Sequence, residues 1–196
     1  MTMNDFYLQP ADVLVNVITG NSPYKVIKRC ALGSPYEHCF MYLGKVRIIV
    51  DPKQNMTLRF PLLFESNGRG VVIQALSNRY GQEVVVLRLK SEYQGKIPRV
   101  LREAVTLASD ERSYYDYFGI VKFVLPRLIC EKLRLPLPLK YYRNLAMVCS
   151  EACAEVFWRA KLVDIVPKGI VPLPSSFVES NLLTKAWEGE LSLGLV

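Results

Sequence analysis

Three side chains in the sequence have the chemistry needed for thiol-dependent acyl transfer: Cys149, His38 and Glu65. A cysteine attacks a carbonyl carbon as its thiolate, and a base within hydrogen-bond reach must take the thiol proton. His38 is the single histidine of the chain, so it is the one imidazole that can be this base. A carboxylate such as Glu65 can accept from the other ring nitrogen and fix the tautomer.

The position of Cys149 along the chain favours its thiolate form. The sequence from Met147 to Trp158 follows a loop-like segment and has helical apolar spacing, which predicts a helix that starts near Cys149. First-turn N–H groups lack intrahelical partners, and the helix dipole adds partial positive charge there. Both effects lower the pKa of a thiol. Cys153, one turn later, is predicted to pack in the core as a small apolar side chain.

His38 and Glu65 are predicted to lie on strands. His38 opens an apolar strand at residues 38–44, and alternation places His38 and Phe40 on one face and Cys39 on the other. This argues against a pair between Cys39 and His38, and it puts Phe40 where it can narrow the cleft beside the base. Glu65 stands near the end of a strand at residues 61–66, just before a Gly-rich turn.

The first half of the chain is rich in β-branched and apolar runs, which predict strands, with one helix at residues 22–32 after the first strand. We expect a mainly antiparallel meander that curls into a barrel-like sheet. The predicted strands are residues 12–18, 38–44, 46–50, 61–66, 71–75 and 83–89, with residues 38–44 and 46–50 joined by a tight turn at Gly44.

The second half changes to helical periodicity. The sequence predicts one domain over residues 1–196, with a helical segment at about 97–140 between the His38 and Glu65 strands and the Cys149 helix. The predicted pieces are a helix at 97–108, an aromatic loop at 114–119, an amphipathic helix at 120–135 interrupted at Pro126, and a Pro-marked tail with a short helix near 175–179.

Composition narrows the classes of partner. The net charge of +7 favours an anionic partner, but the basic residues are spread out and no DNA-reading motif is present, so no nucleic-acid partner is expected. Five cysteines without paired spacing and one histidine do not predict a metal site, and no cofactor is expected. The N-terminus lacks signal-peptide features, and no apolar run reaches the roughly 20 residues of a membrane span, so a cytoplasmic protein is expected.

Four sequence motifs resemble those of the permuted NlpC-type, papain-like cysteine hydrolases, the YiiX-like proteins related to the lecithin:retinol acyltransferase group. The segment Tyr36–Gly44 is similar to their "His-Val-Gly-Ile-Tyr-Leu-Gly" strand, and the order His, Glu, Cys fits the permuted branch. The other three motifs are Phe64-Glu65-Ser66 with Gly70-Val71-Val72, Tyr115-Asp116-Tyr117-Phe118-Gly119, and Cys149-Ser150-Glu151-Ala152-Cys153-Ala154.

The resemblance implies an α+β, papain-like fold in which a curled antiparallel sheet packs against the nucleophile helix. It also implies Cys149, His38 and Glu65 as catalytic residues of a thiol hydrolase or acyltransferase. Such an enzyme cleaves an amide or ester bond of a lipid-like, N-acyl amino-acid or peptide substrate through a thioester. The Cys149 N–H is the expected oxyanion donor, and Tyr42 and Tyr7 are candidates for a second one.

Two alternatives remain open from the sequence. Because Phe40 lies beside the predicted base, the protein can instead be a catalytically silent papain-like binding or assembly module. The stretch at residues 120–135 fits either contact with an anionic membrane surface or a buried helix packed on the sheet. The choice between hydrolysis and transfer, the substrate and the oligomeric state are not determined by these residues.

Overall fold

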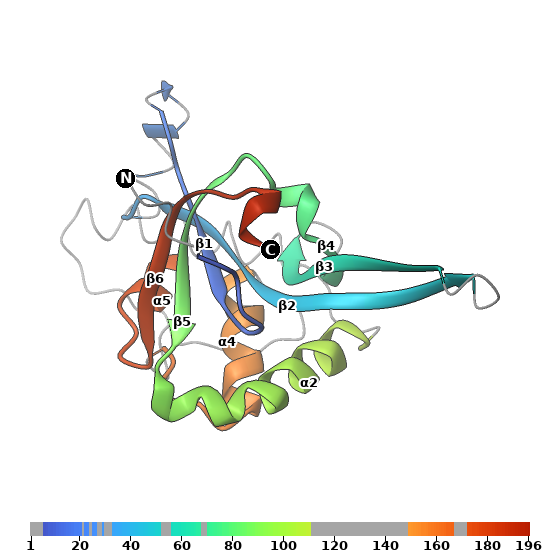
Figure 1. Ribbon diagram of the computed structural model, residues 1–196. Coiled ribbons are helices and arrows are strands. Elements are labelled where there is room, and N and C mark those ends of the chain that lie inside the picture. Colours follow the sequence, from blue (N-terminus) through green and yellow to red (C-terminus); the bar gives the residue numbers. More distant parts are fainter. Residues whose placement is uncertain are drawn as a thin grey trace.

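The computed structural model describes residues 6–20, 22, 23, 25, 26, 29, 33–51, 56–67, 70–110, 149–166 and 172–196, and for residues 48–51, 56 and 57 the description covers the backbone. The described part is an α+β structure built on one antiparallel sheet (Figure 1). Six strands form this sheet among the described residues, in the order β4-β3-β2-β1-β5-β6.

Strands β1 to β5 precede the helices α2, α4 and α5 along the chain, and β6 follows them. The strands are β1 (Val13–Val17), β2 (Tyr36–Asp51), β3 (Met56–Asn67), β4 (Gly70–Ala75), β5 (Glu83–Leu89) and β6 (Leu183–Glu190). The α-helices are α2 (Ile97–Ala108), α4 (Cys149–Arg159) and α5 (Pro174–Val178). Short 3-10 helices are η1 (Leu76–Arg79), η2 (Ser91–Lys96) and η3 (Leu193–Leu195).

The sheet is open, so the expected barrel-like closure is wrong. Strands β4 and β6 occupy the two edges and are not paired with each other in the described sheet. The sequence pattern missed β6, because this edge strand is largely exposed and carries no clear apolar alternation. With β6 added beyond β5, the sheet continues outward instead of returning to β4.

The tight turn expected at Gly44 is also wrong, because β2 is one continuous strand from Tyr36 to Asp51. Gly44 has φ +102°, a conformation that suits glycine, and the register with β3 shifts between Tyr42 and Gly44. The glycine therefore marks a β-bulge and not a strand end. A Cβ on Gly44 would lie 3.3 Å from the Pro10 ring, which is a second reason for glycine here.

Strand β3 begins at Met56, five positions before the predicted start at Pro61. Pro61 is tolerated because pairing with β4 begins only at Leu62↔Ala75, so β3 has a free edge at the proline. The outer parts of β2 and β3, residues 45–51 and 56–61, pair only with each other among the described elements. They form a hairpin arm that projects from the sheet (Figure 1).

Apolar residues fill both faces of the sheet. The larger core lies between the sheet and α2, α4 and α5, and it contains Cys39, Met41 and Phe64. A smaller core on the opposite face contains Phe40 and Tyr42, as the predicted alternation along β2 requires. The central strands are therefore covered on both sides.

Several predicted elements are confirmed. Strands β1, β4 and β5 match the predictions within a residue or two, α2 spans the predicted residues 97–108, and the described part of α4 begins at Cys149. In the predicted helix at 22–32, Pro23, Lys25, Val26 and Arg29 have helical backbone. The aromatic loop at 114–119 and the predicted helix at 120–135 lie outside the described residues.

No helix among the described residues has the length and apolarity needed to cross a membrane.

Candidate active site

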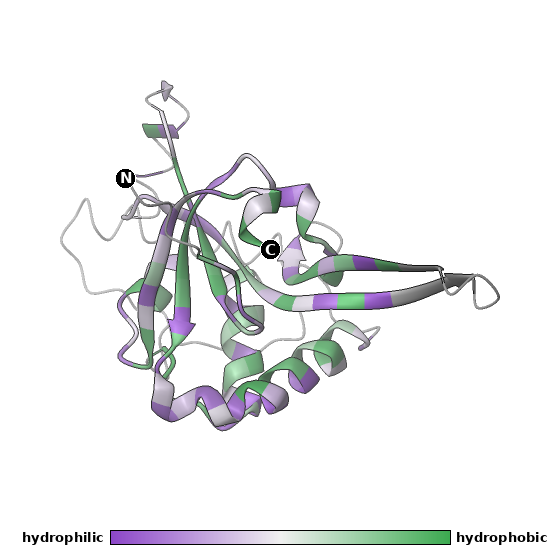
Figure 2. Cartoon of the chain, viewed as in Figure 1, coloured by the Kyte–Doolittle hydropathy of each residue, from purple (hydrophilic) through white to green (hydrophobic). Residues whose placement is uncertain are grey.

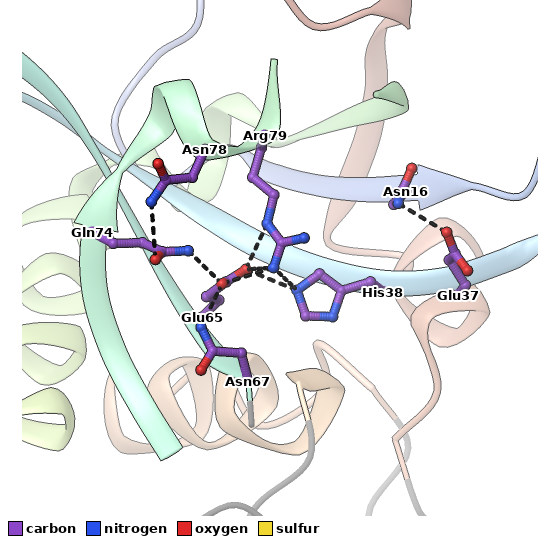
Figure 3. Close-up of polar contacts among 8 residues, drawn as sticks. All are labelled: Asn16, Glu37, His38, Glu65, Asn67, Gln74, Asn78 and Arg79. Carbon is purple, nitrogen blue, oxygen red and sulfur yellow. Dashed lines mark hydrogen bonds and ion pairs between the residues drawn. The ribbon is translucent and has the colours of Figure 1, made fainter. Parts of the chain in front are cut away.

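His38 and Glu65 are joined directly across the neighbouring strands β2 and β3. The imidazole Nε2 lies 2.8 Å from Glu65 Oε2, as Figure 3 shows. Beneath this pair, the Phe40 ring centroid is 6.1 Å from that of His38. The contact uses one ring nitrogen of His38 and leaves Nδ1 for a second partner.

Glu65 is a buried carboxylate surrounded by donors. Its side chain has 0% exposure, and Asn67 Nδ2 and Gln74 Nε2 donate to Oε1 at 2.9 and 2.6 Å. Arg79, which ends η1, grips both oxygens, with Nη2 2.7 Å from Oε1 and 2.6 Å from Oε2 (Figure 3). A buried charge is tolerated when it is paired and hydrogen-bonded in this way. These contacts orient the carboxylate toward His38.

Cys149 approaches His38 from helix α4, which belongs to the layer of helices packed on the sheet. Helix α4 packs against β2 and β3, and the Cys149 thiol is within hydrogen-bonding range of the His38 side chain. The β2–β3 pairing ends at Met41↔Phe64, so the backbone of β2 beyond that point is free on this side. The Cys39 N–H and thiol both donate to the Cys149 sulfur.

The electrostatics favour a thiolate–imidazolium pair. The hydrogen bond from Cys39, with the charge and hydrogen bond of His38, holds the pKa of Cys149 well below its ordinary value although burial opposes this. Burial lowers the pKa of His38, but the Cys149 and Glu65 charges and hydrogen bonds outweigh it and raise the pKa to about 10. For Glu65, burial acts to raise the pKa, but the interactions of its carboxylate with His38, Asn67 and Arg79 outweigh burial and bring the pKa below the ordinary value.

The structure therefore brings together all three predicted site residues, Cys149, His38 and Glu65. Cys153 lies in the larger core, as predicted. Phe40 does lie on the His38 face, but it is fully buried in the smaller core and lines no cleft. The Arg79 guanidinium stacks over it, with Cζ 5.7 Å from the ring centroid.

Neither tyrosine proposed as a second oxyanion donor lies at the site. Tyr42 is buried in the smaller core on the opposite face of the sheet from α4, near Tyr80 and Asp12. Tyr7 is exposed, and its carbonyl accepts from Arg88 of β5. The expectation for these two residues is wrong, because Tyr42 is buried in the smaller core and Tyr7 is exposed away from Cys149.

No sequence pattern marks the residues that hold Glu65. Arg79, Gln74 and Asn67 come from η1, β4 and the end of β3, and none belongs to a recognisable motif. In the sequence, Asn67 stands directly before Gly68 and indicates only a turn. The contact of Cys39 with Cys149 was also missed, because it depends on where the β2–β3 pairing ends.

Comparison with known proteins adds information on the fold. No family model matches the chain, and no curated protein sequence matches it. The crystal structure titled "metalloprotein yiiX from Escherichia coli O157:H7, DUF1105" is similar, with a TM-score of 0.54 and 16% sequence identity over 94% of this chain and 100% of that chain. The chain has a YiiX-like fold. At this identity the likeness extends to the fold alone.

Among the described residues, no group of three or more His, Cys, Asp or Glu side chains is arranged to hold a metal ion. Cys149, His38 and Glu65 do not form such a group, because Glu65 is already occupied by Arg79, Gln74 and Asn67. The side chains of Cys149 and His38, with Glu65 to orient the imidazole, suit proton transfer between a thiol and an imidazole.

Proposed function

We propose that this protein is a thiol hydrolase or acyltransferase that cleaves an amide or ester bond. The observation that carries the proposal is the position of the single imidazole, between the Cys149 thiol and the buried Glu65 carboxylate. Nucleophilic cysteine catalysis needs this order of groups: nucleophile, base and a residue that orients the base. The YiiX-like fold is consistent with the permuted papain-like arrangement that the motifs resemble.

The reaction begins with the Cys149 thiolate and the His38 imidazolium. The sulfur attacks the substrate carbonyl carbon, and the carbonyl electron pair moves to oxygen. When the tetrahedral intermediate collapses, His38 gives its proton to the departing amine or alcohol and a thioester remains on Cys149. Neutral His38 then takes a proton from water or another acceptor, which attacks the thioester and releases the acyl group.

Two features of the chain support the charge movements of this mechanism. The Cys149 backbone N–H, at the first described residue of α4, is the donor we assign to the oxyanion. Glu65, anchored by Arg79, stabilises the imidazolium and fixes its orientation. Because Nε2 is held by Glu65, Nδ1 is the nitrogen that exchanges the proton with sulfur.

The similar structure is titled a metalloprotein. The described residues of this chain provide no group of three or more side chains placed to hold a metal ion. The carboxylate oxygens of Glu65 accept hydrogen bonds from Asn67, Gln74 and Arg79. No step of the proposed mechanism is routed through a metal ion.

Lipid-like, N-acyl amino-acid and peptide compounds are the proposed substrate classes, since each contains an acyl carbonyl that a thiolate can attack. A second candidate function is a catalytically silent binding module. The observation in its favour is limited access: Cys149 has 8% exposure and the His38 side chain 17%.

Reaction with iodoacetamide tests the pair before any substrate is known. We expect Cys149 to be alkylated at neutral pH faster than a free thiol, with a loss of this excess rate in His38→Ala. Iodoacetamide is small enough to report on the thiolate, and mass spectrometry identifies the modified residue. Alkylation of Cys149 no faster than a free thiol, unchanged by His38→Ala, would contradict the proposal.

Turnover is then measured with a panel of amides, esters and peptides. Cys149→Ala and Cys149→Ser should abolish release of the acyl product while the melting temperature stays near that of the wild type. An activated Cys149 that turns over no member of the panel would favour the binding module.

A further inference from the structure

The hairpin arm carries a row of exposed apolar side chains. Val46, Leu58 and Phe60 have exposures of 43%, 41% and 39%. Val46 and Phe60 are cross-strand partners, and Leu58 lies two residues from Phe60 on β3, so the three share one face of the arm. Apolar residues gathered on one exposed face, unlike scattered ones, mark an interaction surface.

Basic side chains occupy the adjacent positions of the arm. Lys45, Arg47 and Arg59 are exposed, and Arg47 and Arg59 are direct cross-strand partners. Like charges placed opposite each other destabilise a sheet, and an anionic partner relieves that repulsion. Residues 45–47 and 58–60 include no acidic side chain. This part of the arm is therefore complementary to a negatively charged partner that also accepts apolar groups.

The apolar face of the arm continues into the main core. Strand β3 alternates without interruption, so Leu58, Phe60 and Phe64 point to the same side of the sheet. Phe64 is buried in the larger core, the one that also contains Cys149. Hydropathy alternates along the part of the arm nearest the body in Figure 2, as expected for a ribbon with one apolar and one polar face.

We infer that the hairpin arm docks on an anionic lipid surface. Val46, Leu58 and Phe60 enter the boundary between headgroups and acyl chains, while Lys45, Arg47 and Arg59 bind lipid phosphates and carboxylates. Basic residues near an anionic leaflet and apolar residues at the headgroup boundary are the two features of such binding. The long stems of Lys and Arg let their charges reach the headgroups from the polar face.

The arm binds at the surface and does not insert deeply. The β1 pairing of β2 covers Tyr36–Met41, and β4 pairs β3 only from Leu62 inward, so the outer edges of the arm have no strand partner among the described residues. Backbone groups on such edges need water or headgroups as partners and are not tolerated in the hydrocarbon core. Docking in the interfacial region satisfies them.

A second copy of the chain fits this surface less well. Pairing of two arms edge to edge is opposed by Pro61, which has no N–H to donate, and by the exposed basic side chains. Each chain also carries a net charge of +7, so two copies repel. The same charge attracts an anionic bilayer.

The inference does not depend on the proposed chemistry, because none of Cys149, His38 and Glu65 belongs to the arm. A failure of lipid binding leaves the thiolate assay unaffected, and an inert Cys149 leaves the flotation assay unaffected.

Vesicle flotation tests the inference with the full chain. The wild type should float with phosphatidylcholine vesicles that contain phosphatidylserine, remain behind with phosphatidylcholine alone, and be released by high salt. Leu58→Ser with Phe60→Ser should lose retention, and Arg47→Gln and Arg59→Gln should each weaken binding about fivefold.

The matched controls are Val105→Ser and Leu193→Ser, exposed apolar residues with 49% and 68% exposure elsewhere on the molecule, which should bind as the wild type does. Equal retention of the arm variants and the wild type, or no retention of the wild type on phosphatidylserine vesicles, would overturn the inference. So would light scattering that shows a dimer broken by Phe60→Ser, because the face would then belong to a second copy. The Arg47 and Arg59 variants keep the test valid if the serine variants do not fold.

Discussion

Arg79 and His38 meet at the same carboxylate oxygen. Nη2 of Arg79 lies 3.2 Å from Nε2 of His38, and both nitrogens contact Glu65 Oε2. A guanidinium can only donate, so a protonated Nε2 places two donors against one acceptor. Arg79 therefore does two things: it holds Glu65 in place, and it opposes the positive charge on His38.

Replacing Arg79 separates these two effects. In Arg79→Gln the buried Glu65 loses its bidentate partner but keeps Asn67, Gln74 and His38, so we expect the free energy of unfolding to fall by about 2–3 kcal/mol. The pKa of His38 should rise, since a neighbouring positive charge is gone. Denaturant unfolding measures the first change, and NMR titration of the single imidazole measures the second. Arg79→Lys keeps the positive charge but loses the bidentate contact, so it is the matched control. It should lower the free energy of unfolding and leave the pKa of His38 near that of the wild type.

The Glu65→Gln variant tests the orienting carboxylate. Glutamine keeps an acceptor for His38 Nε2 but removes the negative charge that helps to raise the pKa of His38 to about 10. The pKa of His38 should fall, and a less stable imidazolium should raise the pKa of Cys149, so rapid alkylation of Cys149 should begin at a higher pH. The rate near neutral pH should drop less than in His38→Ala. A pH profile that matches that of the wild type would show that Glu65 does not act on the imidazole.

The site predicts a stability maximum between about pH 6.5 and 9, bounded by the ordinary pKa values of 6.5 for His38 and 9.0 for Cys149. In that range the folded pair carries one proton, on His38, and the unfolded pair carries one, on Cys149. Below that pH range, the unfolded pair binds a second proton, on His38. Above that range, unfolded Cys149 loses its proton while folded His38 keeps its own up to about pH 10. Stability attributable to the pair should therefore fall on both sides.

Urea unfolding across pH, compared with the double variant Cys149→Ala, His38→Gln, measures this contribution. The difference between the two proteins should be flat within the range and decrease toward either end. A difference that changes steadily across neutral pH would mean that the folded pair is not a thiolate and an imidazolium.

Cys39 is predicted to tune the nucleophile without taking part in the reaction. Its thiol donates to Cys149, so Cys39→Ala should raise the pKa of Cys149, and alkylation should become rapid only at higher pH. The backbone N–H of residue 39 remains, which limits the shift. Cys153→Ala removes the same thiol from a core position one turn along α4 and serves as the control. It should lower stability by about 1 kcal/mol and leave the alkylation profile of Cys149 near that of the wild type.

Several elements of the fold followed from local sequence. The Val-rich runs of β1 and β5 and the apolar stripe of α2 determine their own type, because strand and helix periods depend on neighbouring residues. The helical spacing after Cys149 likewise predicted a helix there. The choice of His38 needed only composition, since the chain has one histidine.

Features that depend on distant pairing did not follow from local sequence. The signal at Gly44 is the same for a turn and for a bulge, and the pairing of β2 with β3 decides between them. Strand β6 is specified by its pairing with β5 and not by its own exposed residues. The open sheet follows from that added strand.

The surroundings of Glu65 were decided by tertiary structure alone. Arg79, Gln74 and Asn67 reach one carboxylate because η1 and β4 fold back beside β3. Sequence by itself determined which groups have the right chemistry, because side-chain identity is local. Their distances, burial and protonation depend on which strands are neighbours, and that is set by packing of the whole chain.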